Sequence, residues 1–134
     1  MLFRSGDVTF SGAKSITGRE FKNGDWAEIT IASENDKAPM PAKTTLKLEA
    51  DENTTDALAY SFGKITYDLD DIPDGAGHYT TFTYTIVESA YGMDGVKKGD
   101  DKVYTIVVTV ADDNTGVLSV TSDQKTDTDY DFVN

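Results

Sequence analysis

The sequence predicts an all-β protein, an antiparallel β-sandwich, and three observations lead to this prediction. Apolar residues recur with a period of two rather than 3.6, threonine is abundant while proline is scarce, and turn signals separate the apolar segments. The chain has 134 residues, the usual length of one domain. We therefore expect a single domain over residues 1–134, with residues 1–6 as a loose N-terminal leader.

The expected strands are short runs of alternating or β-branched residues, each bounded by a turn signal. The clearest signals are Asn23-Gly24-Asp25 before the second strand and Asp112-Asp113-Asn114-Thr115-Gly116 before the seventh. In the second strand Glu28 interrupts the alternation, and Ile29 and Ile31 then have the opposite parity to Trp26, which predicts a bulge or register shift there. In chain order, the expected strands are residues 8–17, 26–33, 44–48, 64–67, 79–88, 103–111, 117–122 and 130–134.

Composition excludes several classes of function. There are 24 acidic and 12 basic residues, a formal net charge of -12, which disfavours binding to nucleic acid or to an anionic membrane surface. No segment approaches the roughly 20 apolar residues of a membrane-spanning helix, and the first six residues lack the apolar region of a signal peptide. The chain has no cysteine and one histidine, which leaves little material for thiol chemistry, a catalytic triad or a histidine metal site.

Three strands each direct one polar side chain toward the core. In the fifth strand Glu88 has the same parity as the apolar Phe82 and Ile86, and in the first strand Lys14 alternates with apolar residues. In the last strand Asn134 shares a face with Phe132. Burying any one of these groups alone costs several kcal/mol, whereas together they can satisfy one another.

Each position also has a simpler explanation. Glu88 and Asn134 stand at predicted strand ends, where alternation often stops and a polar group meets water. Lys14 can extend its ammonium to solvent along an apolar surface, or form a buried ion pair with Glu88. The coincidence of an amine, a carboxyl and a carboxamide on three core faces favours a joint role.

These three groups are the components of an intramolecular amide bond. Burial disfavours charge, so Lys14 tends toward a free amine and Glu88 toward its acid form. The amine can attack the Asn134 carboxamide carbon. Glu88 can hydrogen-bond the Asn134 carbonyl oxygen and pass a proton to the leaving nitrogen, so that ammonia departs. The reaction occurs once per molecule, which makes it self-processing rather than enzymatic turnover.

Five segments together resemble the isopeptide-linked major pilin domain of Gram-positive bacteria, the FctA-like or streptococcal pilin isopeptide linkage domain. The ordered set places all three reactive residues at the family's positions. The segments are residues 13–21 (AKSITGREF) followed by 24–26 (GDW), residues 62–67 (FGKITY), residues 84–88 (YTIVE), residues 103–110 (VYTIVVTV) with 116–118 (GVL), and residues 132–134 (FVN).

The resemblance implies an Ig-like or Cna-B-like sandwich in which Lys14 and Asn134 form the cross-link and Glu88 is the catalytic acid. It implies a structural domain of an extracellular pilus or adhesin shaft, in the cell wall or a fimbrium, with neighbouring pilin subunits or adjacent domains as partners and no cofactor. The sequence shows no LPxTG-like sorting signal. It does not discriminate among the lysines that a sortase could join to the next subunit, which are Lys64, Lys97, Lys98 and Lys125.

Two alternatives remain open. The chain could be a carbohydrate- or protein-binding sandwich that uses Trp26 or Tyr91 as an exposed platform. Such a module could hold calcium in its acidic loops, residues 68–75 and 112–114, although the spacing of an EF-hand is missing and acidic turns are usually only solvated. A hydrolase that uses Glu88 and one loop aspartate is a more distant alternative.

Overall fold

The computed structural model describes residues 5–54, 57–73, 77–97, 102–112, 118–123 and 130–134. Within these residues the chain forms eight strands and one short 3-10 helix. In order they are β1 (Ser5–Ser15), β2 (Trp26–Ser33), β3 (Thr45–Glu49), β4 (Leu58–Asp68), η1 (Leu69–Asp71), β5 (Tyr79–Gly92), β6 (Val103–Asp112), β7 (Leu118–Ser122) and β8 (Phe132–Val133).

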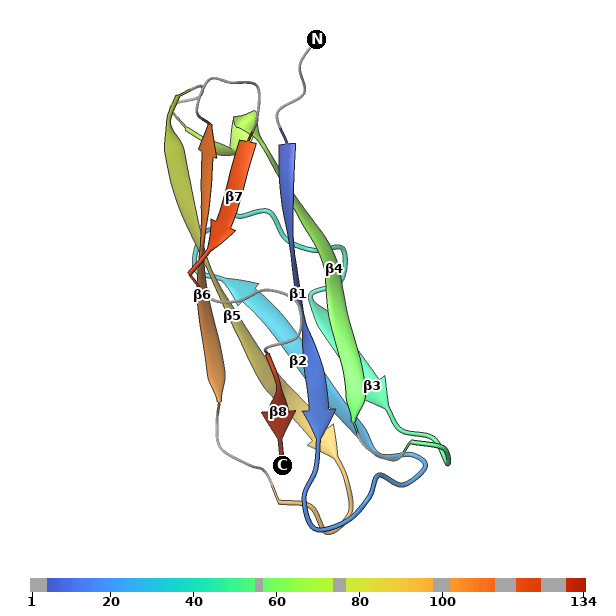
Figure 1. Ribbon diagram of the computed structural model, residues 1–134. Coiled ribbons are helices and arrows are strands. Elements are labelled where there is room, and N and C mark those ends of the chain that lie inside the picture. Colours follow the sequence, from blue (N-terminus) through green and yellow to red (C-terminus); the bar gives the residue numbers. More distant parts are fainter. Residues whose placement is uncertain (1–4, 55–56, 74–76, 98–101, 113–117, 124–129) are drawn as a thin grey trace.

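The strands form two sheets, as expected for a sandwich. One sheet has the order β4-β1-β8 and the other the order β3-β2-β5-β6-β7. The pairings are antiparallel except that of β1 with β8, which is parallel. As a result β1 starts at one end of the sandwich and β8 finishes at the opposite end (Figure 1). The prediction of an all-β sandwich is confirmed.

The core lies between the sheets and consists of the side chains that the period-two pattern selects. In β5 the buried residues are Phe82, Tyr84 and Ile86, and in β1 they include Val8 and Phe10. The β-branched residues of β6 alternate in the same way. Removing this apolar surface from water, at about 25 cal/mol per Å², is the main driving force that holds the two sheets together.

Two strands begin earlier than the pattern predicted. β4 begins at Leu58 rather than at residue 64, because Gly63 interrupts the alternation and adopts a positive φ of 77° where β1 and β4 shift register. β1 includes Ser5 and Gly6, which pair with the end of β4, so the expected leader was wrong for these two residues. Neither residue carries an apolar side chain, and their backbone pairing leaves no sequence signal. Residues 1–4 lie outside the described residues.

The predicted irregularity in the second strand is confirmed. β2 and β5 shift register between Glu28 and Ile29, so Glu28 pairs with Ala90 and Ile29 with Glu88, leaving Ser89 as the extra residue of a bulge. Ile29 and Glu88 end the continuous register that pairs Ile31 with Ile86, so all four residues share the core face, and the bulge follows directly after Glu88. Beyond the bulge β5 goes on pairing with β2, Tyr91 with Ala27 and Gly92 with Trp26.

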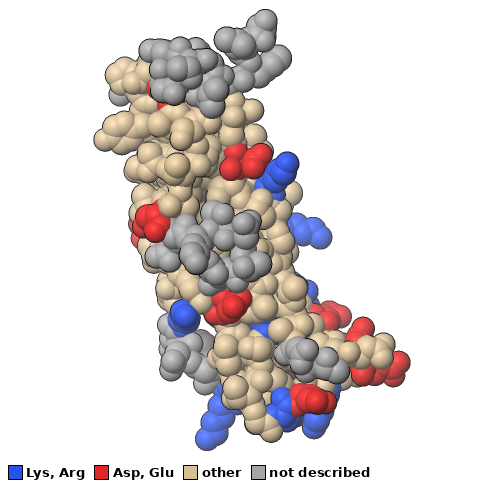
Figure 2. Space-filling model, in the orientation of Figure 1, with Lys and Arg blue, Asp and Glu red and all other residues tan. Residues whose placement is uncertain are grey.

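Charged side chains are scattered over the face shown in Figure 2, most of which is formed by other residues. Acidic and basic side chains are interspersed there, and the described residues on this face form no continuous basic surface. Among the described residues, no helix has the length and apolar character needed to cross a membrane.

Candidate functional site

Lys14, Glu88 and Asn134 meet between the two sheets. Lys14 is near the end of β1, Asn134 directly follows β8, and Glu88 extends from β5 in the opposite sheet. The Lys14 side chain is fully buried and that of Glu88 is 6% exposed. The parity analysis thus placed all three side chains on the correct faces, and the fold brings them together.

The carboxylate of Glu88 contacts both nitrogen atoms. Lys14 Nζ lies 2.8 Å from Glu88 Oε2, and Asn134 Nδ2 donates a hydrogen bond of 2.9 Å to Glu88 Oε1. The hydrogen bond that the structure gives between the two side chains uses the amide nitrogen, and the expected contact of Glu88 with the Asn134 carbonyl oxygen stays a prediction. One carboxylate therefore links the amine to the nitrogen that would leave as ammonia.

The surroundings of Lys14 shift its protonation equilibrium toward the neutral amine. Burial lowers the pKa of Lys14 below its usual value, and the hydrogen bond and charge of Glu88 oppose that shift only in part. Apart from their mutual contact, Lys14 Nζ and Glu88 Oε2 have no hydrogen-bond partner in the described part of the chain. A buried ion pair with so few additional hydrogen bonds is poorly compensated for its lost hydration.

Backbone hydrogen bonds hold Asn134 at the end of β1. The Asn134 N–H donates to the Ser15 carbonyl at 3.1 Å, and the Thr17 N–H donates to the Asn134 carbonyl at 2.8 Å. β8 itself pairs Phe132 with Lys14. The carboxamide is therefore held by its own backbone next to the residue that carries the amine.

A second polar cluster, which the sequence analysis did not identify, lies in the loop after β1. Arg19 forms two hydrogen bonds to the carboxylate of Asp25, at 2.8 and 3.2 Å, and the Lys22 N–H donates to the same carboxylate at 2.7 Å. Arg19 also donates to the carbonyls of Glu20 and Asp94. Arg19 lowers the pKa of Asp25, and Asp25 raises that of Arg19. The only sequence signal was an Asp beside an Asn-Gly turn, which is too common to indicate a partner.

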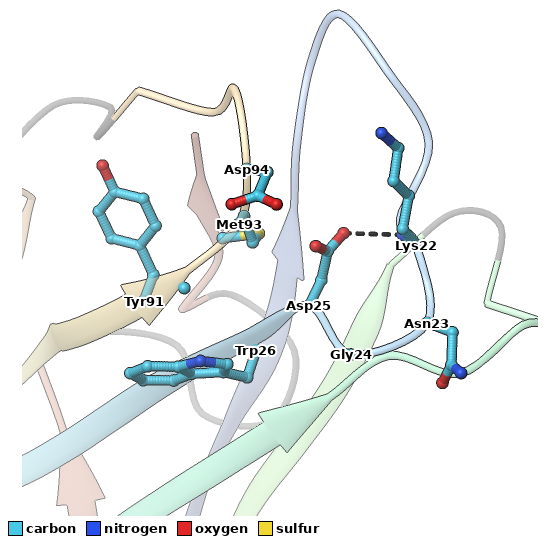
Figure 3. Close-up of a pocket in the computed structure, with 9 residues that line it drawn as sticks. Lys22, Asn23, Gly24, Asp25, Trp26, Tyr91, Met93 and Asp94 are labelled. Atoms are coloured by element: carbon cyan, nitrogen blue, oxygen red, sulfur yellow. Dashed lines mark hydrogen bonds between the residues drawn. The ribbon is translucent and has the colours of Figure 1, made fainter.

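A pocket of about 590 Å³ lies beside this cluster, between the loop after β1 and the end of β5 (Figure 3). Trp26, which the ligand-binding alternative would use, lies against Gly92, where an added Cβ would overlap the indole. Lys47 Nζ is 5.0 Å from the centre of the same ring. Tyr91 and Trp26 are both only partly exposed. The ring surface of Trp26 is thus already in contact with its neighbours in the sheet.

The acidic loops have a structural role where they are described. Asp68 and Asp71 cap the 3-10 helix η1 reciprocally, each accepting a backbone N–H with its side chain. Among the described residues, no group of three or more histidine, cysteine, aspartate or glutamate side chains could hold a metal ion. Asp74, Asp113 and Asn114, which the calcium alternative included, lie outside the described residues.

Comparison with protein families gives one result that fits this geometry. The family model FctA, described as a Spy0128-like isopeptide containing domain, matches residues 10–134, a range that includes all three residues of the site. Comparisons with curated proteins and with solved structures return no match. The match covers nearly the whole sandwich, and the chain therefore belongs to the FctA family of Spy0128-like isopeptide-containing domains, as a structural domain of the pilin type.

Proposed function

We propose that this domain closes an isopeptide bond between Lys14 and Asn134, with Glu88 as the proton carrier, and serves as a covalently locked unit of a surface fibre. The observation that supports the proposal is the double contact of one buried carboxylate with both nitrogen atoms, Oε2 with Lys14 Nζ and Oε1 with Asn134 Nδ2. FctA pilin domains are extracellular surface proteins, which agrees with a fibre.

In the proposed reaction Glu88 first takes a proton from the Lys14 ammonium, leaving a neutral amine and a carboxylic acid. The amine attacks the Asn134 Cγ atom, and the bond between Cγ and Nδ2 breaks as Glu88 donates its proton to Nδ2. The new amide nitrogen loses its second proton to Glu88. The products are a secondary amide, one ammonia molecule and Glu88 in its acid form, so protons and charge balance.

The reaction needs no external catalyst because folding holds the reactants together. Intramolecular reactions of well-oriented groups reach effective molarities of about 10⁵–10⁸ M. Water is excluded from the fully buried amine, which favours its neutral form. Each molecule reacts once, and the domain is in this sense not an enzyme.

Neighbouring subunits or adjacent domains are the proposed partners. Of the lysines considered for a link to the next subunit, Lys64 and Lys97 are exposed, and Lys64 makes only a distant contact of 4.0 Å with Asp7. Lys98 and Lys125 lie outside the described residues. The exposed lysines are available to an acceptor site in a way that the buried Lys14 is not.

Intact-mass measurement tests the proposed bond. The purified protein should weigh less than its sequence by one ammonia, and trypsin should release a branched peptide that joins Lys14 to Asn134. Lys64→Ala is the control, because it removes an exposed lysine and should retain the full loss of ammonia. An unmodified mass in fully folded protein would exclude the bond.

The role of Glu88 requires a separate variant. Glu88→Gln retains the size of the side chain but cannot carry the proton, and it should give a folded sandwich without loss of ammonia. Glu88→Ala should behave in the same way. Complete cross-linking of either variant within hours would show that Glu88 is not the proton carrier, while leaving the bond itself established.

A further inference from the structure

The final segment is bound to β1 by an unusually small ladder. β8 contains two residues, and its pairing with β1 consists of Lys14 with Phe132 and Ser15 with Val133. A two-residue pairing cannot fix a register by itself, because few backbone hydrogen bonds distinguish one alignment from the next. Single backbone hydrogen bonds on either side of this pairing, from the Tyr130 N–H to the Ser11 carbonyl and at Asn134, add to it. Contacts that involve side chains further restrict where this segment stops along β1.

One such contact involves the carbonyl of Tyr130, which precedes β8 and lies directly against Gly12 of β1. A Cβ at Gly12 would overlap this carbonyl, so glycine is required for the close approach. The Tyr60 hydroxyl, on β4, donates a hydrogen bond to the same carbonyl. Tyr60 is 5% exposed, and the donor therefore occupies a fixed position in the core.

A second contact joins the backbone of β1 to the side chain of Asp131, just before β8. The Ala13 N–H of β1 donates to Asp131 Oδ1 at 2.8 Å. The Tyr104 hydroxyl, on β6, donates to the Asp131 carbonyl at 2.7 Å. The ring of Tyr104 also packs edge-on against Phe132 at 5.4 Å. Asp131 is thus held to both sheets, to β1 by its side chain and to β6 by its backbone.

We infer that Asp131 and Tyr104, together with Tyr60, are positioning residues that set the register of the last strand and so bring the Asn134 carboxamide to the Lys14–Glu88 pair. This inference depends on the proposed function. None of the three touches the reacting atoms through a described hydrogen bond. They act through Asn134, which lies three residues after Asp131.

The geometry of strands explains why the register matters for the reaction. A slip of one residue turns the Asn134 side chain to the opposite face. A slip of two residues restores the face but moves the carboxamide by about 6.6 Å along β1, out of reach of Lys14. A displacement of about 1 Å can already cost a factor of about 100 in rate. Only one alignment is therefore productive.

The test measures the rate of bond formation in newly made full-length protein. Cell-free translation with a short pulse of labelled amino acid, followed by denaturation at intervals, separates cross-linked from open chains by gel mobility and by intact mass. The variants are Asp131→Ala and Tyr104→Phe, which keep Lys14, Glu88 and Asn134. Asp131→Asn retains a side-chain oxygen acceptor for Ala13 and is the conservative rescue.

Asp123→Ala is the matched control. Asp123 Oδ1 accepts the Val107 N–H at 2.8 Å, the same kind of bond at the same length, but it joins β6 to the end of β7 away from the reactive residues. A general effect of losing such a bond should appear equally in both aspartate variants.

We expect Asp131→Ala to slow bond formation by a factor of about 10 or more and Tyr104→Phe by a smaller factor, with Asp131→Asn near the wild-type rate. The dependence of the rate on pH should retain its shape, because Lys14 and Glu88 are unchanged. Equal rates in Asp131→Ala and wild type, or equal slowing in Asp123→Ala, would overturn the inference. Absence of the bond in the wild type would instead refute the proposed function.

Discussion

Two ion pairs, both involving the first strand or the loop that follows it, differ in how completely their hydrogen-bonding groups are used. In the Arg19–Asp25 pair the carboxylate accepts three hydrogen bonds, and the guanidinium also donates to two carbonyls. In the Lys14–Glu88 pair the amine and one carboxylate oxygen have only each other among the described residues. We call the first pair saturated, because its charged groups have several hydrogen-bond partners besides each other, and the second pair unsaturated.

The two pairs also differ in their effect on protonation. Asp25 holds the charge of Arg19 and raises its pKa, whereas burial lowers the pKa of Lys14 despite its carboxylate partner. A saturated pair stabilises both charges and is a structural element. An unsaturated pair in a dry site has a neutral amine within reach, and with an amide beside it the pair is suited to react. The two pairs thus differ both in saturation and in burial, since the Arg19 side chain is 20% exposed and that of Lys14 is fully buried.

The largest effect should come from removing the bond at the unsaturated pair. Asn134→Ala keeps Lys14 and Glu88 but leaves no carbon for attack, so a closed loop of about 120 residues is lost. The chain-entropy relation gives a destabilisation of about 5 kcal/mol for such a loop. At about 2–8 °C for each kcal/mol, thermal denaturation should show a Tm lower by at least about 10 °C.

Lys14→Ala should lose a similar amount, because the bond is the common loss, and both variants should become sensitive to trypsin where the wild type resists. A Tm within a few degrees of wild type in either variant would mean that no covalent bond joins the first and last strands.

The second largest effect should come from breaking the saturated pair. Asp25→Asn removes the charge that accepts from Arg19 and Lys22, and hydrogen bonds to charged groups contribute about 1.5–3 kcal/mol. We expect a decrease in Tm smaller than that of Asn134→Ala, with the loss of ammonia complete in the intact mass. Impaired cross-linking in folded Asp25→Asn would show that the two pairs are not independent.

The contribution of the Arg19–Asp25 pair to stability should depend on pH in the acid range. The pKa of Asp25 is lowered from 3.8, so its contribution to stability is complete above that value and is lost as the pH falls through the folded-state pKa. The difference in Tm between wild type and Asp25→Asn should therefore shrink below pH 3.8. A constant difference through this range would mean that the Asp25 carboxylate has no special stabilisation in the folded state.

The smallest effect should appear at alkaline pH and concerns the Lys14–Glu88 pair. In Asn134→Ala the Lys14 amine still titrates, with a folded-state pKa below 10.5. The unfolded chain then binds more protons, so the stability of this variant should rise with pH up to about 10.5 relative to the wild type, in which the proposed bond makes the Lys14 nitrogen an amide. Urea denaturation of both proteins across this range tests the sign. If the stability difference between wild type and Asn134→Ala widened as the pH rises, the lowered pKa of Lys14 would be contradicted.

The extent to which the sequence predicted the fold depended on side-chain parity. Phe82 and Ile86 marked the core face of β5 and thereby showed that Glu88 points inward. The predicted fourth strand began only after Gly63, whereas β4 begins at Leu58. A residue without a side chain gives no parity, and the register of β1 and β4 shifts near it. Polar Ser5 was missed for a related reason, since its contribution to β1 is a backbone pairing.

The site was predictable where it depends on strand faces and not where it depends on loops or on rotation of a side chain. Lys14 and Asn134 were placed by alternation alone. The Arg19–Asp25 pair requires a loop conformation that no periodicity encodes, and the orientation of the Asn134 amide requires the position of Glu88 in the opposite sheet. The role of Asp131 was hidden because it has the outward parity of its strand.

The place of the proposed bond has a topological consequence. Lys14 is near the end of the first strand and Asn134 follows the last, so the bond converts residues 14–134 into a closed ring that contains every connection between strands. A protease that cuts once in any of these connections adds one water molecule but releases no fragment. The nicked domain gains only the mass of that water and remains one covalently connected molecule, and two cuts within the ring are needed before a fragment can be released.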